Sequence, residues 1–280
     1  MIKSPLNYTG GKYKLLKQII PLFPNEINKF IDLFCGGCNV GINVNANKVI
    51  FNDSLTQLIE LYKKWQKDGS EKTNEYIENR IKEFSLSKTN SDGYIHLRSL
   101  YNTEKDIRDL FVLIAHSFNN QIRFNSKSEF NIPFGKNRSD YNNRMKSNLI
   151  EFINEISKEK YLFTNFSFDK IKLDKLSQDD FIYCDPPYLI TNATYNEKNG
   201  WNEDCEHKLY SLLNEANKRG VKFALSNVLE NKGKKNTILS EWITKNEYNV
   251  HHLNHSYHNC NYHSLNKDKD TTDEVLITNY

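Results

Sequence analysis

The sequence lacks any apolar run long enough to cross a membrane, and we expect no signal peptide from its first residues. It has only five cysteines, an odd number that does not suggest a disulfide scaffold. It also lacks a strong charge of either sign, because its net charge is only +3 in 280 residues, which says little about nucleic acid. We therefore expect a cytoplasmic protein with no membrane partner and a full packed core.

The most informative segment that is present is Asp185–Tyr188 (D-P-P-Y). Residues 180–184 before it form a short apolar and aromatic run, and Pro186 cannot donate to a sheet ladder, so a strand is predicted to end there. Open α/β sheets bind ligands at the carboxyl ends of their strands. Acceptors on a stiff backbone beside the ring of Tyr188 suit a planar base with an exocyclic amino group. Outside a strand context, the same four residues could simply be a stiff acidic loop.

A second group of motifs lies near the amino end. Residues 29–34 read as a strand that runs into Gly36 and Gly37, where the missing Cβ lets a ligand approach the backbone. Residues 48–52 read as the next strand, and Asp53 follows it where such folds place the acid that holds ribose hydroxyls. These features predict a nucleoside-cofactor site.

The chain divides into two kinds of sequence. Residues 1–55 and 158–280 alternate strands with helical stretches, which predicts a parallel sheet covered by helices. Residues 56–157 are mostly helical, with a predicted hairpin near 123–134. Six basic residues against two acidic ones between 120 and 146 would suit phosphates, although a solvated face would look the same.

Taken in order, these motifs resemble the Dam-type (class alpha) adenine-specific DNA methyltransferases. The resemblance spans nearly the whole chain and rests on six segments: Tyr8–Lys12, Phe34–Gly37, Asp53, Arg123–Gly135, Asp185–Tyr188 and Val275–Tyr280. It implies a Rossmann-like α/β sheet that uses S-adenosylmethionine, with an inserted, mostly helical DNA-recognition domain. It also implies a monomer that methylates adenine N6 in a short duplex DNA motif, without a metal, alongside a cognate restriction endonuclease.

The resemblance assigns roles residue by residue. The cofactor residues it implies are Tyr8, Lys12, Phe34, Gly36, Asp53, Phe166 and Asp185. The catalytic residues are Asp185, Pro186 and Tyr188, and the DNA-contacting residues are Phe118, Asn119, Arg123, Lys127 and Lys136. Phe118 and Asn119 would enter the duplex or fill the space left by the flipped base. Arg123 would read a guanine edge, and the two lysines would touch phosphates.

The chemistry explains why these residue types are needed. The lone pair of an adenine amino group is delocalised into the ring, so it is a poor nucleophile. Hydrogen bonds to the Asp185 carboxylate and the Pro186 carbonyl would draw the nitrogen toward tetrahedral geometry. Because the amino group lies inside a stacked duplex, the base must be turned out, and Tyr188 would stack on it.

The sequence departs from the family pattern at three positions. Cys38 stands where relatives often carry a further glycine, so we expect a slightly shifted turn. Asn120 and Gln121 replace a small and an apolar residue that are usual in enzymes modifying GATC. GATC is therefore not supported as the recognition sequence.

Several alternatives stay open at this point. The acceptor could be cytosine N4, an RNA base or a protein amide, or the chain could be a DNA-binding protein without activity. Residues 7–12 do not fit a P-loop, and the cysteine pair Cys35-x-x-Cys38 lies in the glycine turn, which favours a cofactor site over redox chemistry. A cluster that could ligate zinc is interpreted instead as a polar loop, because it lacks paired ligand couples. Its members are His251, His252, His255, His258, Cys260 and His263.

Overall fold

The computed structural model describes residues 1–191, 200–254 and 272–280. The chain forms two compact units. The first contains Met1–Gly11, Gly36–Asn43 and Leu55–Asn165, and the second contains Lys12–Cys35, Val44–Ser54 and Phe166–Tyr280. The sequence had placed all of 1–55 with the sheet. In the structure, residues 1–11 and 36–43 belong to the first unit, because side chains of that unit bind them. For example, the Tyr62 hydroxyl donates to the Gly36 carbonyl at 2.7 Å.

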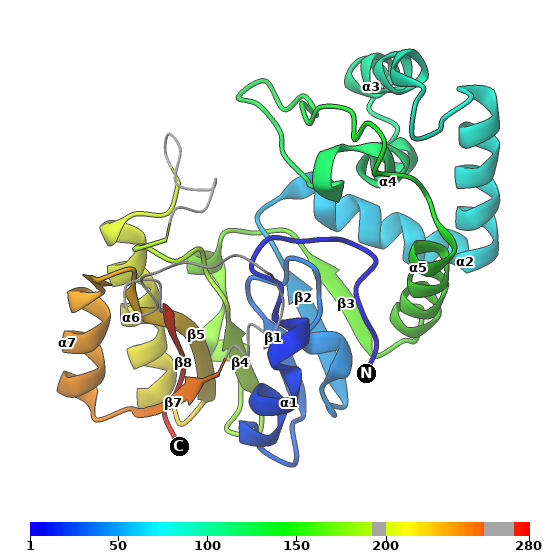
Figure 1. Cartoon of the computed structure of the whole chain (residues 1–280). Helices are drawn as coiled ribbons and strands as arrows, with labels where there is room; N and C mark the ends of the chain where they lie inside the picture. The colour runs from blue at the N-terminus through cyan, green and yellow to red at the C-terminus, as the bar shows by residue number, and fades with distance from the viewer. Residues whose placement is uncertain (192–199, 255–271) are drawn as a thin grey trace. The chain divides into compact units, whose positions relative to one another are not determined.

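The second unit is built on a mostly parallel sheet in the order β2-β1-β4-β5-β8-β7, with β6 paired to β5 (Figure 1). The strands are β1 (Lys29–Asp32), β2 (Lys48–Asn52), β4 (Phe181–Cys184), β5 (Lys222–Asn231), β6 (Lys234–Lys235), β7 (Asn249–Leu253) and β8 (Thr272–Thr278). Strands β2, β1, β4 and β5 pair in parallel, as predicted. Strand β8 is antiparallel to both β5 and β7, which the sequence did not predict.

Both faces of this sheet are covered, which explains the continuously apolar strands. On one face, Phe30 and Phe181 stack with ring centroids 5.6 Å apart, and Phe23 packs 5.0 Å from Phe181. On the other face, Ile31 and Ile182 share a buried cluster with residues of α6 (Glu203–Lys218) and α7 (Thr237–Asn246). The amino-terminal turns of this unit are η1 (Lys12–Leu15), α1 (Leu16–Ile19) and η2 (Ile20–Leu22), and two further turns are η5 (Phe168–Lys170) and η6 (Leu173–Lys175).

The first unit is mostly helical, in agreement with the sequence. Its elements are η3 (Gly41–Asn43), α2 (Thr56–Glu83), α3 (Ser91–Glu104), α4 (Ile107–His116), η4 (Phe118–Asn120), α5 (Asn143–Ile156) and the short strand β3 (Tyr161–Thr164). The apolar spacing of the sequence predicts separate helices at residues 55–65 and 75–84. Helix α2 covers both segments, but Gly69 between them has φ +76°, so the helical geometry breaks there. Polar caps begin the other helices: Asp106 accepts from the Arg108 amide and Asn142 from the Met145 amide.

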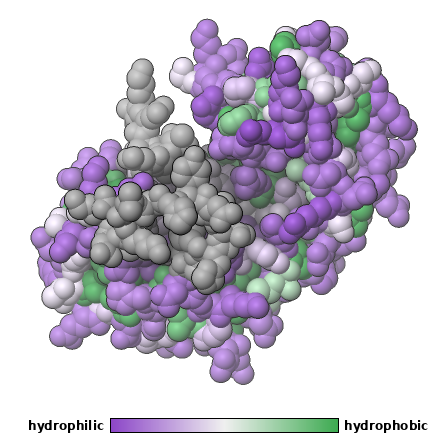
Figure 2. Space-filling view, viewed as in Figure 1, coloured by the Kyte–Doolittle hydropathy of each residue, from purple (hydrophilic) through white to green (hydrophobic). Residues whose placement is uncertain are grey.

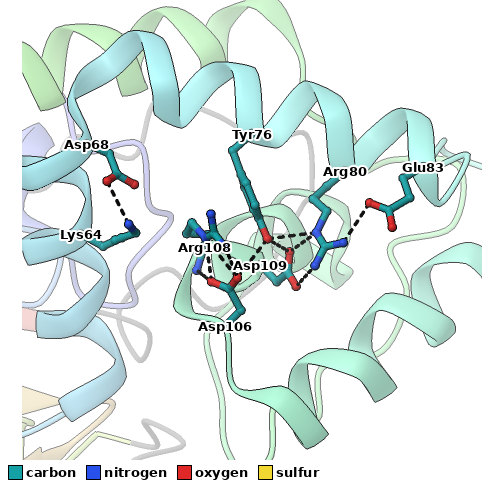
Figure 3. A network of polar contacts seen from close by, with 8 residues as sticks. All are labelled: Lys64, Asp68, Tyr76, Arg80, Glu83, Asp106, Arg108 and Asp109. Carbon is teal, nitrogen blue, oxygen red and sulfur yellow. Dashed lines mark hydrogen bonds and ion pairs between the residues drawn. The ribbon is translucent and has the colours of Figure 1, made fainter.

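An ion-pair network joins α2 to α4 (Figure 3). Arg80 donates to both carboxylate oxygens of Asp109, from Nε at 2.9 Å and from Nη2 at 3.0 Å. The Tyr76 hydroxyl adds a hydrogen bond to the same carboxylate at 2.7 Å. Asp109 is fully buried, so these donors replace the water that its charge lost on folding. The network fixes α4, the helix that leads into Phe118–Asn120.

The visible surface is dominated by hydrophilic side chains, with only small apolar areas between them (Figure 2). Within residues 1–191, 200–254 and 272–280, the structure has no helix that is both long and apolar enough to span a membrane.

Candidate functional site

Three of the predicted site residues follow neighbouring parallel strands of the second unit. The register pairs Asp32 of β1 with Phe51 of β2 and with Tyr183 of β4, so these strands end at the same edge of the sheet. Asp53 and Asp185 come directly after β2 and β4, and Phe34 is the second residue after β1. The structure therefore gathers them where the sequence predicted a ligand site.

Asp185 belongs to a compact group of four side chains, which we call the Lys12 cluster: Lys12, Asp185, Tyr188 and Glu274. Lys12 Nζ lies 2.8 Å from Asp185 Oδ2 and 3.4 Å from Glu274 Oε1. The Tyr188 hydroxyl lies 3.0 Å from Asp185 Oδ1 and 3.1 Å from Glu274 Oε1. The ammonium of Lys12 also lies 5.1 Å from the centre of the Tyr188 ring. Two carboxylates thus share the same two donors.

Burial makes the charges of this cluster matter. The side chains of Lys12 and Glu274 are 4% and 8% exposed, and that of Asp185 is 19% exposed. Burial raises the pKa of Asp185, and the positive charge of Lys12 only partly opposes this shift. For Lys12, burial alone would lower the pKa, but the two carboxylates outweigh it and the pKa is raised. Burial also raises the pKa of Tyr188, so its hydroxyl stays a neutral donor.

Glu274 was missed by the sequence analysis, which read only 275–280 as part of a closing motif. It lies on β8 and is linked to Asp185, the residue after β4, through the donors that they share. The sequence signal that could have identified it is an acid directly before the apolar run 275–277, since an acid in a strand expected to be buried seldom lacks a partner.

Asn52 is a second residue that sequence reasoning missed. Its amide donates to the carbonyls of Leu33 at 3.1 Å and Phe166 at 3.0 Å, and accepts from the Phe166 amide at 3.1 Å. Asn52 is buried, so these bonds satisfy it fully. It therefore fixes the backbone of Phe166, a predicted cofactor residue, against the ends of β1 and β2.

Three aromatic rings meet beside this edge. Phe34 lies with its ring centroid 5.5 Å from both Phe168 and Trp201, and these two rings lie 5.3 Å apart. Trp201 is oriented by its Nε1, which donates to the buried Glu206 of α6 at 2.8 Å. Only Phe34 of these three was predicted to belong to the site.

In the first unit, the predicted residues Tyr8 and Gly36 are in contact. A Cβ on Gly36 would lie only 2.8 Å from two ring atoms of Tyr8, and Gly36 has φ +43°. Glycine is therefore required there both for space and for backbone geometry. Cys38 in the same turn has φ +60°, so it holds with a side chain a left-handed conformation that glycine adopts more easily.

The predicted DNA residues Phe118 and Asn119 lie on a short exposed turn after α4, which we call the Phe118 loop (Phe118–Asn120). Phe118 is 41% exposed, and its amide donates to the Pro133 carbonyl at 2.8 Å. Asn119 and Asn120 have φ +57° and +53°, a conformation that Asn tolerates better than most residues. Asn120 donates to the Ala115 carbonyl at 2.9 Å, so its amide satisfies the end of α4.

Two side chains that the sequence did not single out brace the Phe118 loop. The guanidinium of Arg138 lies 5.0 Å from the centre of the Phe118 ring and donates to Asn119 Oδ1 at 3.3 Å. Asn7 Nδ2 donates to the Asn119 carbonyl at 2.9 Å. The exposed ring and its neighbour are thus held in one arrangement by groups distant in sequence.

The segment predicted as a hairpin reverses direction but forms little sheet. Its antiparallel pairing is an isolated bridge between Phe124 and Phe130, in place of two regular strands. Arg123 is exposed, and its Nε donates to Asn131 Oδ1 at 3.0 Å. Lys127 and Lys136 are exposed as well. All three basic side chains are accessible to a polyanion. Their roles in contacting DNA stay predictions.

The histidine cluster is only partly described. His252 pairs with Asp273 at 2.8 Å, and His251 contacts the Thr278 hydroxyl at 3.2 Å. His255, His258, Cys260 and His263 lie outside the described residues. Among the residues that are described, no three His, Cys, Asp or Glu side chains gather as metal ligands.

Comparison with known proteins identifies the class. The family model of D12 class N6 adenine-specific DNA methyltransferases matches residues 8–259, so the chain belongs to that family. It is 47% identical to the modification methylase StsI of Streptococcus sanguinis and 48% identical to the type II methyltransferase M.FokI of Planomicrobium okeanokoites. Both alignments cover all of this chain.

The chain spans 43% of the length of each of those two relatives. The type II methyltransferase M1.LlaDCHI of Lactococcus lactis subsp. cremoris is 30% identical over 98% of this chain and 94% of its own length. The resemblance drawn from the sequence motifs is confirmed, and the D12 class is a finer label than Dam-type.

Proposed function

We propose that this chain transfers a methyl group from S-adenosylmethionine to the N6 atom of an adenine turned out of duplex DNA. The observation that carries the proposal is the Lys12 cluster, which places a largely buried carboxylate, paired with a lysine, at the end of β4 in a chain of the D12 class. The modification methylase and type II methyltransferase among the relatives further support a role in a restriction–modification system. The target adenine is proposed to lie within one short DNA motif.

The residues of the second unit fit the cofactor by their chemistry. S-adenosylmethionine supplies an electrophilic methyl group on a sulfonium when it is bound. Asp53 and Asp185 are acids that could accept from ribose hydroxyls and an ammonium group, and Phe34 and Phe166 are apolar surfaces for an adenine ring. Asn52 holds Phe166 rigidly, which lowers the entropic cost of binding. Lys12, and in the first unit Tyr8 and Gly36, complete the proposed cofactor residues.

The same end of β4 prepares the nucleophile. Asp185 and the Pro186 carbonyl accept from the target amino group and localise its lone pair. Tyr188 offers its ring to the extruded base. As the nitrogen gains its fourth bond it becomes positively charged, and the Asp185 carboxylate stabilises that charge until the proton is lost to solvent. Holding both reactants in line supplies about 7–11 kcal/mol in favourable cases.

The first unit is proposed to recognise DNA. The Phe118 loop presents an exposed ring that could fill the space left by the flipped base, and Arg123 could read a guanine edge. Lys127 and Lys136 are proposed to contact phosphates. The amide of Asn120 is used at the end of α4, so this departure from the GATC-type pattern acts on loop geometry and not directly on base reading.

Single-molecule sequencing of plasmid DNA from cells that express the protein tests the proposal. Methylated adenine within one short motif, absent from cells expressing Asp185→Ala, is the expected result. Methylated cytosine in place of methylated adenine would show that the acceptor is cytosine. Unmodified DNA in the presence of folded protein that binds S-adenosylmethionine would direct attention to RNA or protein amides, and loss of cofactor binding would indicate a DNA-binding protein without activity.

A further inference from the structure

The Lys12 cluster contains one carboxylate more than the proposed chemistry uses. Asp185 is assigned to the target amine, but both of its oxygens already have donors in this structure: Lys12 at Oδ2 and the Tyr188 hydroxyl at Oδ1. A carboxylate that accepts from two protein donors is a weaker acceptor for a third. Each oxygen can still accept a second hydrogen bond, but the amine engages Asp185 more strongly when at least one of these donors turns elsewhere.

Glu274 is the group to which both donors can turn. Its Oε1 lies 3.1 Å from the Tyr188 hydroxyl and 3.4 Å from Lys12 Nζ, so neither donor has to leave its place to reach it. The hydroxyl carries a single proton and can donate to only one of the two carboxylates at a time. The Tyr188 hydroxyl is thus one donor for which the carboxylates of Asp185 and Glu274 compete.

The burial of Glu274 excludes a simple surface role. Its side chain is only 8% exposed, and a buried carboxylate is costly unless charged partners and hydrogen bonds compensate for the lost water. Lys12 is the cation of this cluster, and it faces both acids. An apolar residue on β8 would avoid this cost, so a stability role alone does not account for an acid at this position.

We propose that Glu274 is a positioning residue that takes over the donors Lys12 and Tyr188 when the target amine engages Asp185. Donation from the hydroxyl to Glu274 leaves Asp185 Oδ1 for an amino hydrogen. The same bond keeps the Tyr188 ring anchored while it stacks on the base. The inference rests on the proposed function, because it explains how Asp185 becomes available to that substrate.

The test compares four variants with the wild-type protein: Glu274→Gln, Glu274→Asp, Glu274→Ala and Asp273→Asn. Glu274→Gln keeps size and an acceptor but removes the charge, and Glu274→Asp keeps the charge. Asp273→Asn is the matched control, because it removes a carboxylate from the adjacent position of β8, where the side chain is 39% exposed and pairs with His252. The reaction is single-turnover transfer of labelled methyl groups from S-adenosylmethionine into unmethylated plasmid DNA.

We expect Glu274→Gln to slow transfer by about 100-fold, the size of effect that a small misplacement of reacting groups produces. Glu274→Asp should retain more of the rate than Glu274→Gln. Cofactor affinity from calorimetry, DNA affinity and the melting temperature should stay as in the wild type, because the exchange acts on the chemical step. Asp273→Asn should react at the wild-type rate.

Three outcomes would overturn the proposal. A Glu274→Gln rate equal to that of Asp273→Asn would show that Glu274 takes no part. A slower rate that is fully explained by weaker cofactor binding, or that is accompanied by a lower melting temperature, would make Glu274 a structural residue. If Glu274→Ala fails to fold, the nearly isosteric glutamine variant still decides. If the wild-type protein itself labels no DNA, the proposed function fails and the inference fails with it, a result distinct from the other two.

Discussion

The Lys12 cluster and the Phe118 loop are assembled in opposite ways. Lys12 and Glu274 of the cluster are buried and Asp185 is largely buried, and its members come from η1, the end of β4 and strand β8. The loop is exposed, and it keeps its shape through left-handed asparagines and a few side-chain contacts. Burial strengthens the interactions between charges in the Lys12 cluster, whereas solvent weakens the polar contacts of the Phe118 loop.

The difference matches what each region is proposed to do. Transfer chemistry needs acceptors whose positions and charges change little, and rigid strand ends supply them. DNA recognition needs an exposed ring that can enter a duplex, so the loop must remain accessible while it stays ordered. We expect substitutions in the cluster to affect the rate and substitutions in the loop to affect binding.

The largest effect is expected on stability, at Asp109 of α4, the helix that precedes the Phe118 loop. Asp109→Ala should lower the free energy of unfolding by about 3–5 kcal/mol, because it leaves the guanidinium of Arg80 without its main partner. Urea unfolding measures this. Lys64→Met on α2, the helix of Arg80, is the control, since it removes a partly exposed ion pair with Asp68 that is worth at most about 1 kcal/mol. Equal losses in both variants would contradict a special role for the buried network (Figure 3).

At the cluster, Asp185→Ala should slow methyl transfer by about 100- to 1000-fold, because it removes the acceptor that localises the lone pair of the amine. Single-turnover kinetics with plasmid DNA measures this. Asp179→Ala, an exposed acid just before the other end of the same strand, should have no effect. A fully active Asp185→Ala protein would end the proposed mechanism.

In the first unit, Arg123→Ala should reduce discrimination at one base pair by about 1–3 kcal/mol while leaving the methyl-transfer rate on the preferred site nearly intact at saturating DNA. Competition between single-base variants of the methylated motif measures this. Arg144→Ala, an exposed arginine on α5, is the control. A uniform weakening for all sequences would make Arg123 a phosphate contact instead.

A smaller effect is expected from Arg138→Ala. The contact of its guanidinium with the exposed Phe118 ring is worth about 0.5–1 kcal/mol, and its loss should weaken DNA binding by that amount for every sequence. Arg138→Lys should retain part of the effect. A change in base preference with unchanged affinity would argue that Arg138 reads sequence and does not brace the loop.

The smallest expected effect is a shift in pH dependence. Burial raises the pKa of Asp185, Lys12 lowers it, and the like charge of Glu274 raises it again. Glu274→Gln removes the last contribution, so the pKa of Asp185 should fall and the residual activity should persist to lower pH than in the wild type. The acid limb of kcat/KM measures this, with Asp273→Asn as control. An acid limb that moves to higher pH would contradict the assigned charges.

Much of the fold could be predicted from local patterns. Apolar runs that stop at Pro186 or before Asp53 predicted strands that the structure contains, and periodic apolar residues predicted the helices of the first unit. The placement of Asp185 at a strand end followed from these patterns. The antiparallel direction of β8 did not, because strand pairing depends on neighbours that are distant in sequence and overrides local preference.

The sequence by itself determined the class of the protein, the order of its motifs and the acid at the end of β4, because these depend on residue types and on spacing along the chain. Only the tertiary structure decided which side chains complete the two regions. Glu274 shares its donors with Asp185, Asn52 fixes Phe166, and Arg138 covers Phe118. These contacts join residues distant in sequence, and their energies depend on burial that no short segment specifies.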